Sequence, residues 1–416
     1  MTTMQNTSNI NMLFRSLRHR NFRLFFIGQL VSLIGTWMQN MGQAWLVLDL
    51  THSAFKLGVV TALQFAPMLF LSFPAGVFID FFPKRKIIIA TQLFMMLLAF
   101  TLAILNWTGV VQYWHVLILA TLLGIANTID MPARQAFVIE LVGKEDLMNA
   151  IAMNSSIFNA ARAIGPAIAG LVIGAVGTAL CFFLNGLSYI AVIWGLLLMT
   201  FEVLPAAKRR EYHVIADIQE AMRAIRATPI VMVTILLVAV IAIFATNFTV
   251  LVPIFARQEL HRDAAAFGFL MSSFGLGALL GSATLALLSR EAPKPSLLFS
   301  SGMGLSLVLM TIGLQNSYAL TAFLLALCGW SMVTFFGMSN SIIQLNTPDR
   351  LRGRVMSIYT FTFGGLTPIG SLFAGTMAHW INTPLTFALG GLMSGIIFFI
   401  VIVKQRKITA PKRNEP

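Results

Sequence analysis

Charged side chains inside long apolar runs are the residues of this sequence whose types and spacing could do chemistry. Asp130 and Arg134 lie four residues apart in one such run, on the same face of a predicted helix. Arg162 lies in another apolar run, 159–177, one turn before Pro166. Because a charge inside hydrocarbon is costly, each of these residues is expected to have a partner or a function.

The sequence allows two interpretations of these charges. In the first, Asp130 and Arg162 form a static salt bridge that holds two helices together. In the second, Asp130, which could also pair with Arg134, binds a proton while the Asp130–Arg162 pair breaks and re-forms during a conformational cycle. The second hypothesis makes Asp130, Arg134 and Arg162 a proton-coupling site, and the sequence does not decide between the two.

A polar stripe along the first apolar run is a candidate binding surface. Its members recur every three or four residues, which places them on one helical face. In lipid such a stripe must face protein or a water-filled cavity. One interpretation is hydrogen bonding between packed helices, and the other is the wall of a central substrate cavity. The stripe consists of Gln29, Ser32, Thr36, Asn40 and Gln43, with Gln39 beside it, and the second half of the chain offers Asn247, Ser331 and Thr334.

The composition is that of a membrane protein. The 416 residues are 57% hydrophobic and only 10% charged, with a mean hydropathy of +0.83, whereas soluble proteins carry about 25% charged residues. The net charge of +13 lies in short loops, so we expect no nucleic-acid partner. The motifs HExxH, GxSxG and GxxxxGK[ST] are absent, which argues against an enzyme and against direct use of ATP. No cofactor or metal site is expected.

Twelve apolar runs are long enough to span a bilayer, which predicts an all-α membrane protein with twelve transmembrane helices. A long polar loop at 201–229, with apolar residues at helical spacing, divides the runs into two groups of six and predicts an amphipathic linker helix. The expected spans are 24–48, 57–79, 87–107, 113–135, 150–174, 178–200, 230–252, 266–289, 296–314, 318–342, 355–378 and 384–403.

Lysine and arginine predict the orientation. If the twelve spans alternate, nearly all basic residues fall on one side, and the opposite side holds only Lys56, Arg257 and Arg262. By the positive-inside rule both termini are cytoplasmic. The expected organisation is a cytoplasmic segment 1–23, a six-helix half 24–200, a cytoplasmic linker 201–229, a second six-helix half 230–403 and a basic cytoplasmic tail 404–416.

The two halves resemble each other. The stretch from Glu145 and the stretch from Asp349 both begin with an acid-x-Leu and lead to a proline followed by glycines. This pattern predicts a parallel duplication of six spans, with a site at the interface between the halves. In the first copy, Gly165, Pro166 and Gly170 leave one helix side nearly bare. That side fits either a tightly packed helix or a hinge between moving halves, with a kink at Pro166.

The loop from Gly76 to Lys86, GVFIDFFPKRK, resembles the signature loop of the major facilitator superfamily, Gly-x-x-x-Asp-Arg-x-Gly-Arg-Arg/Lys. Gly76, Asp80 and the basic cluster match, whereas Phe81 and Pro83 replace the family's arginine and second glycine. The resemblance implies the major facilitator fold and a cytoplasmic gate between Asp80 and the basic start of span eleven. The implied gating residues are Gly76, Asp80, Lys84, Arg85, Arg352 and Arg354, with a simple helix-end charge as the alternative for Asp80. Gly165, Pro166 and Gly170, which are also expected to serve gating, resemble the span-five signature of proton-coupled drug exporters.

Four longer stretches are similar to the branch of that superfamily that holds the enterobactin exporter and macrolide efflux proteins. They begin at Leu17, Leu48, Asp130 and Leu351. The resemblance implies a proton-coupled exporter of an amphipathic small molecule, a siderophore or a drug-like compound, acting by alternating access as a monomer in a bacterial cytoplasmic (inner) membrane. Uptake of a small molecule, and a membrane scaffold or sensor that transports nothing, remain the alternatives.

Overall fold

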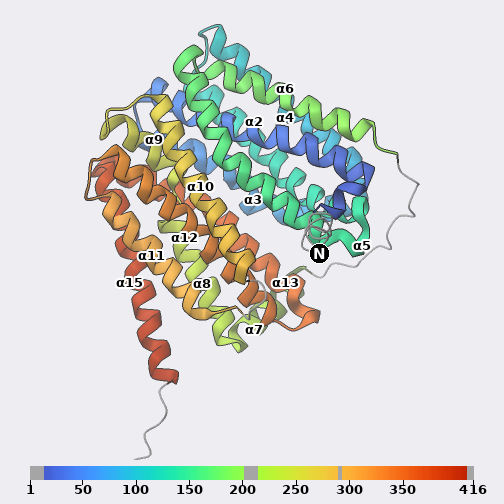
Figure 1. The fold of residues 1–416 in the computed structure, drawn as a ribbon, viewed down its shortest axis with the longest axis vertical. Coiled ribbons are helices and arrows are strands. Elements are labelled where there is room, and N and C mark those ends of the chain that lie inside the picture. The colour runs from blue at the N-terminus through green and yellow to red at the C-terminus, as the bar shows by residue number, and fades with distance from the viewer. Residues whose placement is uncertain (1–13, 201–213, 289–292, 410–416) are drawn as a thin grey trace, which may run out of the picture.

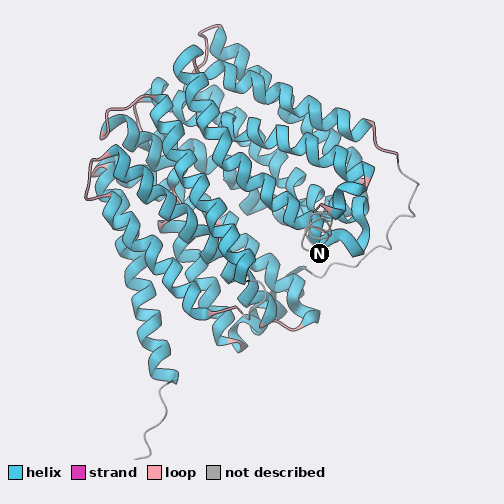
Figure 2. Ribbon diagram, viewed as in Figure 1, coloured by secondary structure: helices cyan, strands magenta, loops and turns pink. Residues whose placement is uncertain are grey.

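The computed structural model describes residues 14–200, 214–288 and 293–409. Within these ranges the chain consists of helices and short connections, as Figure 2 shows. Two groups of helices lie side by side, the first blue to green and the second yellow to red in Figure 1. The fold class is therefore all-helical, as predicted.

The first group follows a short 3₁₀ turn, η1 (Arg15–Arg18). It consists of α2 (Arg20–Thr51), α3 (Ala54–Phe81), α4 (Lys84–Trp107), α5 (Tyr113–Val176) and α6 (Thr178–Leu197). The 64-residue α5 contains two helices that meet at Gly143, where φ is +70°. Glycine has no Cβ atom and tolerates this left-handed backbone. The fourth and fifth predicted spans lie on either side of this break.

The helix α7 (Val214–Ala227) precedes the second group and lies within the predicted linker 201–229. The second group contains α8 (Pro229–Phe244), α9 (Phe248–Gln258), α10 (Ala264–Leu288), α11 (Pro295–Ile312), α12 (Tyr318–Leu345), α13 (Asp349–Thr360), a π-turn η2 (Phe361–Gly365), α14 (Thr367–Trp380) and α15 (Thr383–Thr409). The predicted seventh span covers α8 and α9, and the predicted eleventh covers α13, η2 and α14.

Nine helical segments of the described ranges are long and apolar enough to cross a membrane. Neither α2, which carries the polar stripe, nor α13–α14, which is interrupted by η2, is among them. Pro166 lies within α5, whose backbone departs from helical angles only at Gly143. The expected kink at Pro166 is therefore not a break in the helix.

Glycines bring α2 and α6 together. Gly28, Gly35 and Gly42 recur every seven residues on α2, so they lie on one face. A Cβ atom on Gly28 would lie 3.0 Å from the Ala191 carbonyl oxygen, and one on Gly35 would lie 2.6 Å from Asn185 Oδ1. Packing without side chains lets the two backbones approach closely. It also fixes the rotation of α2 and hence the direction of its polar stripe.

Two glycine crossings are among the contacts between the two groups. On α5 and α10, a Cβ atom on Gly170 would lie 2.9 Å from the Cα atom of Gly268. On α3 and α14, a Cβ atom on Gly58 would lie 2.9 Å from the Cα atom of Gly375. Both crossings lie at the end of the molecule where α3 and α10 begin. We call this end the α9 end, and the opposite end, where α7 meets α13, the α7 end.

Candidate functional site

The structure divides the polar stripe of α2. Gln39 and Gln43 are buried and hydrogen bond to neighbouring helices of the first group: Asn185 Nδ2 donates to Gln39 Oε1 (2.6 Å), and Gln43 Nε2 donates to Gln64 Oε1 (2.8 Å). Ser32 is also buried and accepts at its carbonyl oxygen from Thr36 Oγ1 (2.9 Å).

The other stripe residues, Gln29, Thr36 and Asn40, are partly exposed. Gln29 Oε1 is itself buried and lacks a hydrogen-bond partner. Packing between helices therefore accounts for one part of the stripe, whereas the side chains of the second part remain partly exposed.

The candidate cavity residues of the second group are buried. Asn247 lies at the break between α8 and α9, where its Nδ2 donates to the Ile243 carbonyl oxygen (2.8 Å). Ser331 and Thr334 lie in the interior of α12, and Thr334 Oγ1 has no hydrogen-bond partner. In this conformation these three side chains are buried between packed helices.

Asp130 and Arg134 form an ion pair inside the first group. Arg134 Nε lies 2.5 Å from Asp130 Oδ2, and both side chains are largely buried. From α4, Thr91 Oγ1 and Gln92 Nε2 donate to Asp130 Oδ1 at 2.6 and 3.2 Å. The carboxylate thus has a full set of donors, as a buried charge requires.

Arg162 lies apart from this network, contrary to the predicted Asp130–Arg162 pair. Its guanidinium carbon lies 5.4 Å from the ring centre of Trp37 and 4.9 Å from that of Phe158. Among the described residues it forms no ion pair, and its Nε is buried without a hydrogen-bond partner. The spacing of Asp130 and Arg134 indicated their pairing, whereas the surroundings of Arg162 depend on how α2 packs against α5.

An ion pair that sequence reasoning missed joins the two groups at the α9 end. Arg257 Nη1, on α9, lies 2.6 Å from Asp49 Oδ1, on α2. The Arg257 guanidinium also lies 5.5 Å from the Trp45 ring centre, and Trp45 stacks on Phe267 of α10 at 5.9 Å. The two charges are 208 residues apart, so no local sequence signal could pair them.

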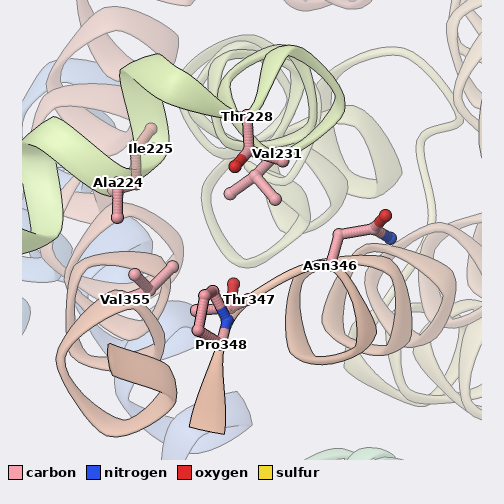
Figure 3. Close-up of a pocket in the computed structure, with 8 residues that line it drawn as sticks. All are labelled: Ala224, Ile225, Thr228, Val231, Asn346, Thr347, Pro348 and Val355. Carbon is pink, nitrogen blue, oxygen red and sulfur yellow. The ribbon is translucent and has the colours of Figure 1, made fainter. Parts of the chain in front are cut away.

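At the α7 end the basic start of α13 binds the linker helix. Glu220 of α7 pairs with Arg350 (2.6 Å) and with Arg354. Ile225 of α7 and Val355 of α13 are buried there and line a small pocket together with residues of α8 and the α12–α13 connection (Figure 3). Sequence reasoning missed Glu220.

The other predicted gating residues are dispersed over the same end. Lys84 Nζ pairs with Glu140 (3.2 Å), Arg85 donates to the Leu197 carbonyl oxygen (3.2 Å), and Arg352 pairs with Asp349 (2.5 Å). No atom lies within 4 Å of a Cβ placed on Gly76. The Asp80 side chain lies outside the described part of the structure. By contrast, Gly165 packs on Trp37, and the Pro166 carbonyl oxygen and Gly170 contact Gly268.

Solved transporter structures share this fold. A POT family transporter in complex with a thioalcohol-conjugated peptide has a TM-score of 0.75 at 12% identity, covering 94% of this chain and 97% of its own. A bacterial homologue of the lysosomal transporter Spinster, in an inward-facing conformation, has a TM-score of 0.68 at 14% identity, covering 92% and 95%.

Two characterised relatives cover nearly the whole chain. The staphyloferrin A transporter of Staphylococcus aureus is 26% identical over 408 residues, which are 93% of this chain and 96% of the relative. The enterobactin exporter EntS of Escherichia coli is 25% identical over 394 residues, 94% and 93% of the two chains.

Fold and relatives together define a class. The chain is a multi-pass membrane transporter of the major facilitator type, and not an enzyme. A family model described as transmembrane secretion effector matches residues 12–415, so the chain belongs to the transmembrane secretion effector family.

Proposed function

We propose that this protein is a secondary active exporter of a siderophore, working by alternating access. The observation that carries the proposal is the asymmetric contact between the two helix groups. At the α9 end the groups meet through two glycine crossings and the Asp49–Arg257 ion pair. At the α7 end Arg350 pairs with Glu220 of α7, and Arg352 pairs with Asp349 of α13. A transporter whose halves are held together at one end by such contacts fits one of the two states that alternating access requires.

The orientation follows from charge. Nine apolar segments become twelve spans if α5 counts as two and if α2 and α13–α14 are included. With twelve spans, the basic residues gather at the α7 end, which the positive-inside rule assigns to the cytoplasm together with both termini. The α9 end then faces outward, so the described conformation is closed to the outside.

The repeated glycine crossings support two six-helix halves, 24–200 and 230–403. Gly58 of α3 lies five residues after the helix cap Ser53, and Gly268 of α10 lies five residues after Asp263, whose carboxylate accepts from the Ala266 amide. Their partners Gly375 and Gly170 end related stretches, GSLFAG and GPAIAG. A duplicated six-span unit produces both crossings from a single packing solution.

The choice of cargo and direction rests on the relatives. One is described as an enterobactin exporter and the other as a staphyloferrin A transporter, and both names denote siderophore transport. The family description, secretion effector, favours export. The partly exposed Gln29, Thr36 and Asn40 on α2, with Trp37 beside them, give the path a polar and aromatic wall that suits an amphipathic molecule.

Protons are the proposed driving ions. The sequence lacks a P-loop, so ATP does not act directly. Asp130 is the carboxylate buried deepest within a helix of the described bundle, with an exposed fraction of 5%. Proton binding there would release Arg134, and the opening and closing of this buried charge pair couples proton movement to the conformational cycle. The protein is proposed to act as a monomer.

A deletion strain tests the proposal. Under iron starvation, loss of an iron-chelating compound from the medium with accumulation inside the cells is the expected result, reversed by the unsubstituted gene. The same strain is tested against a panel of lipophilic antibiotics. Unchanged chelator with greater drug sensitivity would replace the siderophore by drug-like cargo. If neither changed, export itself would be wrong.

A further inference from the structure

Arg162 is a membrane-embedded cation whose charge the described protein does not neutralise. Trp37 and Phe158 lie against its guanidinium, and their ring centres are 6.0 Å apart in an edge-on arrangement. Aromatic faces attract a cation but do not carry a counter-charge. The Nε atom is buried and has no acceptor. An arginine at membrane depth normally pairs with an acid or a carbonyl oxygen, so the missing partner needs an explanation.

The position of Arg162 on α5 shows where its side chain is directed. Gly165, roughly 60° to one side at 3.6 residues per turn, contacts Trp37 of α2. Asn159 and Ala163, roughly 60° to 100° to the other side, contact Ser282 and Gly275 of α10. Arg162 therefore lies between the helix of the first group and the helix of the second.

The lipid-facing side of α5 lies opposite. Ile164, Ile168 and Leu171 are exposed and apolar, and they lie roughly 180° to 240° around the helix from Arg162. Ser155, seven residues before Arg162 and therefore on the same face, is exposed and polar. This polar, accessible face belongs to the space between the two groups.

Three large side chains of α2 also lie near the space between the two groups. Trp37, Met41 and Trp45 follow at intervals of four residues, and Trp45 contacts Phe267 and Arg257 of the second group. Trp37 lies about 80° around α2 from Trp45, between the side that contacts α5 and the side that faces the second group. The Arg162 cluster, defined as Arg162, Trp37 and Phe158, consequently lies where alternating access places the cargo.

We propose that the Arg162 cluster is an anion-binding subsite for a carboxylate group of the cargo, an inference that rests on the proposed export function. A planar guanidinium binds a carboxylate through two parallel hydrogen bonds, and such pairs are stronger in a low-dielectric site. The two rings fix the guanidinium plane and offer an apolar surface to the carbon atoms next to the carboxylate. The cargo supplies the counter-charge that the protein lacks.

Equilibrium dialysis of the purified full chain in nanodiscs tests this assignment with 1-naphthoate as the anionic probe and 1-naphthamide as its uncharged counterpart. Arg162→Gln is expected to weaken naphthoate binding at least tenfold and to leave naphthamide binding unchanged. Arg162→Lys keeps the charge but cannot donate two parallel hydrogen bonds. This variant is expected to retain an intermediate affinity for naphthoate. Lys144→Gln removes an exposed charge from the same helix and serves as the matched control.

Folding provides a second measurement. Because Arg162 is not part of an ion pair, Arg162→Gln is expected to keep the thermal midpoint of the unsubstituted chain, whereas a purely structural arginine would lower it. Absence of naphthoate binding to the unsubstituted chain, or equal loss of both probes in Arg162→Gln, would overturn the subsite.

The two proposals, siderophore export and the anion-binding subsite, can fail independently, and the experiments distinguish these outcomes. If naphthoate binding depends on Arg162 but the deletion strain secretes normally, the subsite stands and siderophore export is wrong. If secretion depends on the gene while Arg162→Gln binds naphthoate and secretes normally, export stands and the subsite is wrong.

Discussion

Asp130 accepts hydrogen bonds from residues of two helices. A variant of Asp130 must therefore distinguish a static hydrogen-bond network from a proton-binding site. Its two oxygens receive Arg134, Thr91 and Gln92 at 2.5 to 3.2 Å. A static network and a proton site both fit one conformation, because a proton site must also be stabilised while it is charged. The two hypotheses differ in what happens when the charge is removed.

Asp130→Asn is expected to lower secretion to the level of cells treated with a protonophore, and the protonophore should then have no further effect. The physical reason is that a neutral side chain cannot release a proton and rebind Arg134. The measurement is chelator secretion by the complemented deletion strain, with and without protonophore. Secretion that stays high and protonophore-sensitive would refute coupling through Asp130.

Stability must be separated from coupling in this variant. Removing one member of a buried pair costs about 3–5 kcal/mol, because the other charge is left uncompensated. The double variant Asp130→Asn/Arg134→Gln removes both charges and should regain most of the thermal stability lost in Asp130→Asn. If the double variant also regains protonophore-sensitive secretion, the pair is structural.

The sequence indicated the contact between Asp130 and Arg134 but not the surroundings of Arg162. The interval of four between Asp130 and Arg134 sufficed for their ion pair, since residues i and i+4 share a helix face. The partners of Arg162 could not be predicted, because they depend on the register between α2 and α5. Glycine at position 165 sets that register by letting Trp37 approach.

At the scale of the element, two glycines on the small-residue face of α5 differ in their contacts with α10. We expect Gly170, but not Gly174, to be needed for closure at the α9 end. A Cβ atom on Gly170 would lie 2.8 Å from the Ala264 carbonyl oxygen, which is backbone and cannot move aside easily. On Gly174 the nearest atom would be the Ala265 Cβ at 3.8 Å, an ordinary contact. The two glycines of one GxxxG step therefore form a matched pair.

Gly170→Ala is expected to shift the conformational equilibrium away from closure at the α9 end, whereas Gly174→Ala should not. Overpacking of this kind costs about 1–3 kcal/mol, which corresponds to roughly a 5–150-fold change in the population ratio. Spin labels at the exposed positions Lys56 and Gln258, with both native cysteines replaced, report the separation by electron resonance. Identical distance distributions in the two variants would contradict this account.

The linker helix α7 is held to α13 by one acid and two arginines. Glu220→Gln is expected to raise hydrogen exchange of 218–227 severalfold, because partly exposed ion pairs contribute about 0.2–1 kcal/mol each. Hydrogen exchange measured by mass spectrometry checks this. Glu145→Gln is the control, since Glu145 is 90% exposed and its arginine partner is 3.8 Å away. Equal exchange in both variants would show that the buried apolar face of α7, and not the Glu220 ion pairs, holds α7 to α13.

Helix positions were predictable from hydropathy, whereas interruptions inside helices were not. The predicted seventh span is broken near Asn247, and the eleventh contains the π-turn at 361–365. Both interruptions lie within apolar sequence, so hydropathy alone carries no signal for them. At these interruptions side chains of the same segment hydrogen bond to the backbone: Thr246 Oγ1 and Asn247 Nδ2 donate to the Ala242 and Ile243 carbonyl oxygens, and Thr362 Oγ1 donates to that of Ile358.

At the scale of the whole molecule, the two glycine crossings and the Asp49–Arg257 pair lie at the same end. Glycine crossings contribute close backbone packing, which is insensitive to salt, while an ion pair with side-chain exposures of 44% and 32% is screened by it. Closure at the α9 end thus combines a contact surface that is insensitive to salt with a weaker, ionic one. The ionic part can be altered without changing the shape of the surface.

Asp49→Asn is expected to favour opening at the α9 end by a small amount, because a partly exposed pair contributes about 0.2–1 kcal/mol, or up to about fivefold in the population ratio. The spin-label pair at Lys56 and Gln258 measures this shift at low and high salt. In the unsubstituted chain, high salt should shift the distances in the same direction as Asp49→Asn, and in the variant salt should have little further effect.

The reverse-charge pair makes the test specific. Asp49→Arg should open the α9 end further than Asp49→Asn, because two arginines then face each other, and Asp49→Arg/Arg257→Asp should restore the original distances. Restoration would show that the pair acts through charge between the two halves. If the swapped pair stays open, Arg257 acts mainly by stacking on Trp45, and the closure is aromatic instead of ionic.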